Sequence, residues 1–362
     1  MRFIITFFLT FSSLYATPND DDLRKMIGHM LIVGFDEAML SPTSPILEEI
    51  QRYELGGVIL FDRFYNDKNR TKNISSPAQL KALTSMLKQR SKKPLLICVD
   101  QEGGKVARLK PSYGFEATPS AYAIAQHSLE NAYQRYTAMA QMLVGNGINC
   151  NFAPDVDIAI NPNNKVIVGL ERSYGKEPNV VANYALAMLQ AFDQQNIIGV
   201  LKHFPGHGSS KDDSHLGFVD VSNTWSAQEL EPYKKLMSHK ETRMIMSAHV
   251  FNATLDSSYP ATLSYATNTT LLRKTLGFKG VLVSDDLHMK AIHDAYSLQQ
   301  TVTLAINSGV DMLLFGNQLA HISTKEIVET ILANVKNGTI PVARIMEANE
   351  RIATLHHERR PL

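Results

Sequence analysis

Eight short runs of apolar residues recur along the chain at fairly regular intervals. They occupy residues 30–35, 57–61, 95–100, 148–153, 198–201, 244–248, 280–285 and 311–316. The runs are continuously apolar rather than alternating with polar residues, which is the pattern of strands that are covered on both faces. We therefore expect eight buried strands of a parallel sheet.

Helical patterns lie between several of these runs. Ser76 and Pro77 form a helix start, with a capping residue and a proline at the first helical position, and Leu80, Leu83 and Leu87 then form an apolar stripe. Other helical patterns cover residues 129–144, 180–192 and 301–308, and acidic residues 20–22 mark one more helix start. Strands that alternate with helices predict an α/β fold, a single (β/α)8 TIM-type barrel, with an open doubly wound sheet as the alternative.

Length and composition fit one domain. The chain has 362 residues, of which 44% are hydrophobic and 20% charged, so a large core can form. After the eighth run the pattern is helical only, at residues 325–336 and 342–356. We expect residues 17–362 to form one barrel domain and the protein to be a monomer. The net charge is +1 and no dense basic run occurs, which argues against nucleic acid as a partner.

Residues 1–16 have the pattern of a secretory signal peptide. Arg2 precedes an apolar stretch at residues 3–11, and Ala16 supplies a small residue at the expected cleavage site. The stretch is too short to span a bilayer comfortably, so we expect no stable membrane insertion after cleavage. These features predict export to the periplasm. An uncleaved anchor or a buried first helix is the alternative.

Two cysteines, Cys98 and Cys150, lie in apolar runs. Two are too few for a disulfide framework, and buried thiols are the simpler interpretation. Export would permit a bridge between them, but only their geometry decides whether one forms.

The densest cluster of titratable groups is the segment KHFPGHGSSKDDSH, from Lys202 to His215. It holds three histidines, two lysines and two aspartates in fourteen residues. It directly follows the apolar run at residues 198–201, and its proline and glycines favour a loop. In a barrel the active site collects at the carboxyl ends of the strands, so we expect this loop to belong to a site.

Other polar residues follow other runs. Asp100 ends the third run, with Arg108 shortly after it, and Arg172 lies beyond the fourth. Asp285 and Asp286 end the seventh run, where two adjacent carboxylates on a buried strand end are costly without a purpose. Three further residues are better explained structurally: Asp155 and Asp157 as helix caps or partners of a barrel cation, and His249 as a hydrogen-bonded core histidine.

These side chains fit one kind of chemistry. Asp285 is a candidate nucleophile for a reaction with a covalent intermediate. His215 titrates near neutrality and is a candidate acid/base, and Asp213, two residues earlier, could orient its ring. The remaining candidates suit a ring of hydroxyls and an amide carbonyl; they are Asp100, Arg108, Arg172, Lys202 and His203.

Several motifs in order resemble those of glycoside hydrolase family 3 β-N-acetylglucosaminidases of the NagZ type. They are KHFPGHG with Asp213-Ser214-His215, residues 100–104 with Arg108, and residues 172–175, 260–264 and 283–287. Together they span roughly residues 25–355. Two departures are Ser209-Ser210, where many relatives have Asp-Thr, and His288, where Ser or Glu is common.

The resemblance implies a (β/α)8 barrel that releases non-reducing terminal N-acetylglucosamine from peptidoglycan fragments or related β-N-acetylglucosaminides. It implies that Asp285 forms a glycosyl-enzyme intermediate, that His215 paired with Asp213 is the acid/base, and that the five other candidates hold the sugar. This differs from the usual two-carboxylate design of retaining glycosidases. No cofactor or metal is expected. Because a neutral acid/base repels anions less than a carboxylate does, phosphate is a conceivable acceptor.

Three other interpretations stay open. A metal hydrolase could use His203, His207, His215 and Asp213 as ligands, but Pro205 and Gly206 rule out a shared helical face for the first two. An exported sugar-binding protein would need neither the acid pair nor the His/Asp couple. A family 3 β-glycosidase of other specificity, such as a β-glucosidase, would usually carry extra domains and lack the loop histidine.

Overall fold

The computed structural model describes residues 18–213 and 217–357. The expected signal peptide at residues 1–16 lies outside the described residues, as does His215. Within the described ranges, every helix is too short or too polar to cross a bilayer.

The eight predicted strands form one parallel sheet. In chain order they are β1 (Leu31–Gly34), β2 (Gly57–Ile59), β3 (Leu96–Val99), β4 (Cys150–Asn151), β5 (Ile198–Phe204), β7 (Met244–Ser247), β9 (Val281–Ser284) and β10 (Leu313–Phe315). Neighbours in the sheet follow the order β10-β1-β2-β3-β4-β5-β7-β9. The edges meet where Ser284 N donates to Met312 O over 2.9 Å, so the sheet curls into a barrel. The predicted fold class is confirmed.

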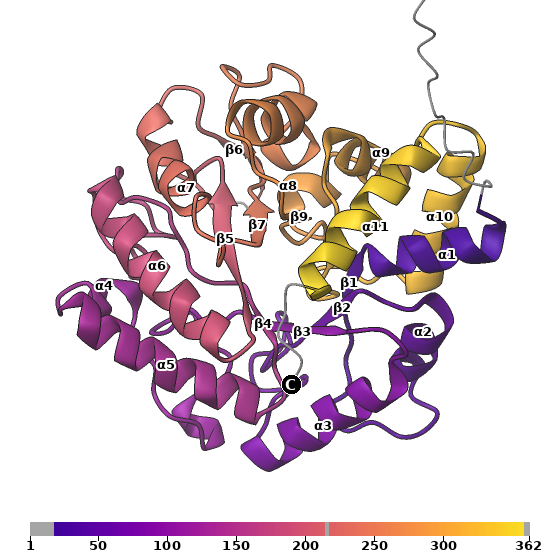
Figure 1. The fold of residues 1–362 in the computed structure, drawn as a ribbon, viewed down its shortest axis with the longest axis horizontal. Helices are drawn as coiled ribbons and strands as arrows, with labels where there is room; N and C mark the ends of the chain where they lie inside the picture. Colours follow the sequence, from indigo (N-terminus) through magenta and orange to yellow (C-terminus); the bar gives the residue numbers. More distant parts are fainter. Residues whose placement is uncertain (1–17, 214–216, 358–362) are drawn as a thin grey trace, which may run out of the picture.

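Helices surround the strands as an outer layer (Figure 1). They are α1 (Asp20–His29), α2 (Pro45–Tyr53), α3 (Pro77–Arg90), α4 (Ala121–Ile124), α5 (Leu129–Gly145), α6 (Pro178–Gln194), α7 (Glu231–Leu236), α8 (Lys290–His293), α9 (Leu298–Ser308), α10 (Thr324–Lys336) and α11 (Val342–His357). Helix α1 contacts α10 and α11, so the first and last described helices lie side by side.

Local signals place the helix ends where the sequence predicts them. The side chain of Ser76 accepts a hydrogen bond from Gln79 N at the start of α3, and Leu80, Leu83 and Leu87 of this helix are buried. Gly309 ends α9 with φ 113°, a conformation that favours glycine. The helices α4, α7 and α8 were not predicted, because four to six residues carry too little periodicity to recognise. Helix α2 was also missed, although Pro45 and the buried Ile46, Leu47 and Ile50 were a recognisable helix signal.

The core is continuous from the barrel interior to the layer between strands and helices. Cys98 on β3 and Cys150 on β4 are register partners across the parallel ladder. Both lie in the described part of the chain, where they are buried and not joined by a disulfide. Burial in the barrel wall therefore accounts for both thiols.

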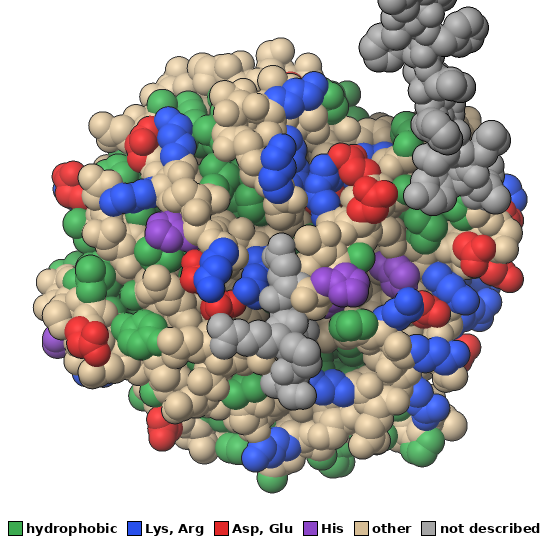
Figure 2. All heavy atoms as spheres, viewed as in Figure 1, with side chains coloured by type: hydrophobic (Ala, Val, Ile, Leu, Met, Phe, Trp, Pro, Cys, Tyr) green, Lys and Arg blue, Asp and Glu red, His purple; other side chains and the backbone are tan. Residues whose placement is uncertain are grey.

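Further elements follow the carboxyl ends of β5 and β7. A small parallel pair, β6 (Val219–Asp220) and β8 (Val250–Phe251), and a 3₁₀ helix, η2 (Ala227–Leu230), belong to this region. The face drawn in Figure 2 carries acidic and basic side chains that are interspersed, in keeping with the small net charge.

Candidate active site

A pocket of about 370 Å³ opens at the carboxyl ends of the strands. Its lining includes every predicted site residue that the structure describes: Asp100, Arg108, Arg172, Lys202, His203, Asp213 and Asp285. Asp100 directly follows β3, Lys202 and His203 lie in β5, and Asp285 directly follows β9. Residues from distant parts of the sequence meet because parallel strands end on the same side of a barrel. The predicted acid/base, His215, lies outside the described residues.

Lys202 is the centre of a buried ion-pair network. Its Nζ lies 2.9 Å from Asp100 Oδ1 and 2.7 Å from Glu102 Oε1. Arg108 reaches the other oxygen of Asp100 over 3.4 Å. Burial by itself would raise the pKa of Asp100, but Lys202 and Arg108 outweigh it and hold that pKa below its usual value. The pocket therefore presents an ionised Asp100 beside a charged lysine.

Arg172 is clamped by two acidic residues. Its Nε and Nη2 donate to both oxygens of Glu102 over 2.8 and 2.7 Å, a bidentate pair. Its Nε also lies 3.2 Å from Asp155 Oδ2. Burial opposes charge on Glu102, but Arg172 and Lys202 keep its pKa low. Glu102 lies in the motif at residues 100–104. Its role as the partner of two cations was not predicted, because Arg172 and Lys202 are far from it in the sequence.

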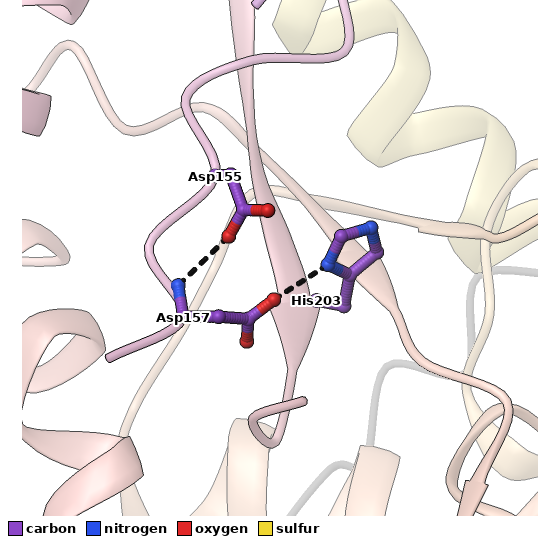
Figure 3. Close-up of side chains that lie close together, drawn as sticks. All are labelled: Asp155, Asp157 and His203. Carbon is purple, nitrogen blue, oxygen red and sulfur yellow. Dashed lines mark hydrogen bonds and ion pairs between the residues drawn. The ribbon is translucent and has the colours of Figure 1, made fainter. Parts of the chain in front are cut away.

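His203 is held by Asp157, as Figure 3 shows. Its Nδ1 lies 2.7 Å from Asp157 Oδ2, and its Nε2 lies 3.3 Å from Arg172 Nη2. A guanidinium only donates, so Nε2 accepts and Nδ1 carries the proton. Burial and the nearby Arg172 lower the pKa of His203 to about 4, so the ring is neutral at neutral pH. The Lys202–His203 peptide in this strand is cis.

Asp157 has a second task. Its Oδ1 accepts the backbone N–H of His207 over 2.7 Å, so one carboxylate holds both the ring of His203 and the start of the next loop. Asp155 Oδ1 accepts the N–H of Asp157 over 2.9 Å (Figure 3). Burial and the neighbouring Asp157 raise the pKa of Asp155 well above its usual value. The expected pairing of Asp155 with a barrel cation is present, whereas the histidine partner of Asp157 was not predicted.

The acidic pair after β9 divides into two roles. Asp286 Oδ1 accepts the backbone N–H groups of His288 and Gly316, both over 3.0 Å, so this carboxylate shapes the loop. Asp285 Oδ1 accepts the N–H of Asp286 over 2.8 Å, and its side chain lines the pocket. His249 is a core histidine, as predicted: it is buried, and its ring bonds Thr262 Oγ1 and the carbonyl of Asp286.

One group in the described part of the chain has the composition of a metal site, namely Asp155, Asp157 and His203. It differs from the set considered from the sequence, because His207 bonds Ser210 Oγ through Nδ1 instead. In this group the Nδ1–H of His203 already occupies Asp157, and Arg172 lies against Asp155. A metal here would have to break the His203–Asp157 hydrogen bond and lie beside the Arg172 guanidinium.

Residues 22–355 match the model of the glycosyl hydrolase family 3 N-terminal domain. The chain belongs to glycosyl hydrolase family 3. The resemblance inferred from the motifs is thereby confirmed.

Individual members of family 3 are similar over most of the chain. Beta-hexosaminidase A of Pseudoalteromonas piscicida is 36% identical over 341 residues, which cover 84% of this chain and 55% of the relative. A beta-hexosaminidase of Tolumonas auensis is 35% identical over 279 residues, covering 75% of this chain and 79% of the relative. The structure of a family 3 beta-N-acetylglucosaminidase from Paenibacillus sp. str. FPU-7 superposes with a TM-score of 0.84 at 32% identity.

The alignments also bound what the chain shares with these proteins. The match to the Paenibacillus structure covers 93% of this chain and 62% of that structure. This chain spans 55% of the length of the Pseudoalteromonas beta-hexosaminidase A. The residues that match the family model, 22–355, include all those that line the pocket.

Proposed function

We propose that the chain is a retaining exo-β-N-acetylglucosaminidase. The observation that carries the proposal is the pocket itself, in which the carboxylate of Asp285 lies with Asp100, Lys202 and His203 at the strand ends of a family 3 barrel. The names of the similar proteins, beta-hexosaminidase and beta-N-acetylglucosaminidase, support the same substrate class.

The reaction proceeds in two displacements at the anomeric carbon. First, an oxygen of Asp285 bonds this carbon while the glycosidic oxygen leaves and takes a proton from His215. Then water attacks the same carbon, His215 removes its proton, and the bond to Asp285 breaks. Asp213 holds the tautomer of His215. Two inversions leave the β configuration unchanged.

Sugar binding falls to the charged wall of the pocket. Asp100 accepts hydrogen bonds from ring hydroxyls, while Lys202 and Arg108 donate to hydroxyl or amide oxygens. Neutral His203 is held in one orientation by two contacts. Asp157 accepts from its Nδ1, and Arg172 Nη2 lies against its Nε2. Preorganised partners of this kind contribute to catalysis because they need not reorganise when the transition state forms.

The aglycone that we propose is a peptidoglycan fragment. The pocket lining also contains Arg63, Lys68 and Lys105, three cations beyond the sugar-binding group. Muropeptides carry carboxylates that such cations would attract, whereas a chitin-derived aglycone is neutral. Export to the periplasm, proposed from residues 1–16, would place the enzyme beside this substrate. A family 3 β-glycosidase of other specificity, or a phosphorylase, is the second candidate.

Product analysis tests the proposal. Purified enzyme is incubated with a disaccharide-peptide wall fragment, with chitobiose and with an aryl β-glucoside, each with and without phosphate. We expect free β-N-acetylglucosamine as the first-formed product and faster cleavage of the wall fragment. A glucoside cleaved faster than both, or sugar phosphate as the product, favours the second candidate. Asp285→Ala should abolish turnover in a folded protein, and near wild-type rates would exclude Asp285 as the nucleophile.

Mass analysis of the protein recovered from periplasm tests the localisation. A polypeptide that begins after Ala16 is expected. A protein found only in the cytoplasm with residues 1–16 attached would contradict export.

A further inference from the structure

Glu229, a residue that no sequence motif pointed to, is almost fully buried at 1% exposure. It belongs to η2, which follows Asp213 along the chain. Its Oε2 accepts the backbone N–H of Gly208 over 2.8 Å. A carboxylate is costly to bury, and it is retained in a core when its hydrogen bonds determine a local conformation.

The contact with Glu229 is close enough to require a glycine. A Cβ on Gly206 would lie 2.5 Å from the Cβ of Glu229, and Gly206 has φ +125°, which side chains rarely adopt. Next to it, the indole Nε1 of Trp225 donates to Pro205 O over 3.1 Å. The segment from Trp225 to Glu229 therefore holds the turn at residues 205–208 at two points.

The opposite side of the same turn is held by the loop after β4. Asn164 Nδ2 donates to His207 O over 2.9 Å, and Asn161 N donates to Gly208 O over 3.2 Å. Gly208 is thus bound through its N–H by Glu229 and through its carbonyl by Asn161. The chain then continues to Asp213, which lines the pocket.

We infer that Glu229 is a positioning residue for the loop that leads to Asp213, acting through the backbone of residues 206–208. Glu229 is absent from the described lining of the pocket, so it acts without touching the substrate. Asp157 holds the N–H of His207 and Glu229 holds that of Gly208, so two buried carboxylates set where the loop leaves β5. The inference rests on the proposed function, because it assigns protonation of the leaving group to His215.

The burial of Glu229 has an electrostatic signature. Burial raises the pKa of Glu229 to about 7, while interactions with Ser209 and Gly208 act in the opposite direction. Its Oε1 has no hydrogen-bond partner among the described residues. A glutamine at this position would keep one oxygen for Gly208 N, so Glu229→Gln is the conservative variant and Glu229→Ala the deletion.

The test is a leaving-group series. Wild type, Glu229→Ala and Glu229→Gln each cleave two aryl N-acetyl-β-glucosaminides, one with a poor and one with a good leaving group. The quantity compared is kcat/KM for the poor leaving group divided by kcat/KM for the good one. Poor leaving groups need protonation, and acid catalysis contributes about 10²–10⁴-fold. We expect Glu229→Ala to lower the ratio at least about tenfold and Glu229→Gln to restore most of it.

This ratio does not depend on how much of the sample is folded, because both substrates meet the same enzyme. Glu231→Ala is the matched control, since Glu231 is exposed on the adjacent α7 and pairs only with Lys234 among the described contacts. If Glu229→Ala does not fold, Trp225→Phe removes the neighbouring hydrogen bond and should shift the ratio in the same direction. An unchanged ratio in the folded variants overturns the inference. Wild type that cleaves no N-acetylglucosaminide overturns the proposed function instead.

Discussion

The Nδ1–H of His203 donates to Oδ2 of Asp157 over 2.7 Å, while Oδ1 of the same carboxylate accepts the N–H of His207 over 2.7 Å. One buried side chain thus fixes both the tautomer of a pocket histidine and the backbone of His207 in the loop that leads to Asp213. An asparagine offers one acceptor oxygen where Asp157 offers two.

Asp157→Asn should therefore break one of these two hydrogen bonds whichever way its amide points. We expect kcat/KM to fall about 10–100-fold, with a stability loss of about 1–3 kcal/mol from the unsatisfied group. Steady-state kinetics and urea denaturation measure the two effects. Asp294→Asn, at an exposed aspartate, is the control. Wild-type kinetics in Asp157→Asn would show that the orientation of His203 does not matter.

Removal of the acid/base should depend on the leaving group. His215→Ala is expected to cost about 10²–10⁴-fold on a poor leaving group such as a sugar, and far less on dinitrophenol, which needs no proton. The ratio of kcat/KM for the two substrates is the measurement. An equal loss on both substrates would argue against an acid role for His215.

Loss of the central lysine should destabilise the fold. Lys202→Met leaves the buried Glu102 and the half-buried Asp100 without their shared cation, and breaking a buried pair costs about 3–5 kcal/mol. Urea unfolding of wild type and variant gives the difference. Adding Asp100→Asn to Lys202→Met should recover part of it, because the charge of Asp100 is then held only by Arg108 over 3.4 Å. A single variant as stable as wild type would mean that water reaches this network.

His288 should make the fold acid-sensitive. Its ring is 1% exposed, and neither nitrogen has a hydrogen-bond partner among the described residues. Burial and the neighbouring His293 lower its pKa to about 4. At pH values between the unfolded pKa of about 6.5 and this folded pKa, the unfolded chain binds a proton at His288 and the folded chain does not. Stability contributed at neutral pH is therefore lost as the pH falls through this window.

The variant His288→Phe removes that proton uptake and keeps the ring packed against Phe315. Relative to wild type it should gain up to about 1.4 kcal/mol per pH unit between pH 6.5 and 4. Chemical denaturation at several pH values measures the gain, with His127→Ala at an exposed histidine away from this site as the control. Parallel stability curves for wild type and His288→Phe would show that His288 is solvated.

Chelators should leave turnover unchanged. Asp155, Asp157 and His203 lie close enough to share a metal, but His203 Nδ1 hydrogen-bonds Asp157 and the Arg172 guanidinium lies 3.2 Å from Asp155 Oδ2. Activity after dialysis against EDTA is compared with activity after added Zn²⁺. Loss with EDTA and recovery with Zn²⁺ would restore the metal-hydrolase interpretation.

Much of the barrel could be predicted because its signals are local. Each strand appears as a continuous apolar run, and caps such as Ser76 and the terminating Gly309 depend on a few neighbouring residues. The pocket residues could be predicted for the same reason, since polar groups such as Asp100 and Asp285 directly follow a strand. The roles of Glu102, Asp157 and Glu229 could not, because each depends on a partner far away in the chain.

The sequence by itself indicated the eight strands, the end of the barrel where the site lies and several of the residues that line it, among them Asp100, Lys202 and Asp285. Only the tertiary structure decided which group each buried carboxylate binds. Asp157 binds His203, and Glu102 binds Arg172 and Lys202. Glu229 binds the backbone N–H of Gly208. The physical reason is that hydrophobic periodicity involves residues that are neighbours in the sequence. The energy of a buried charge, by contrast, depends on distances of about 3 Å that exist only after distant strand ends have been brought together.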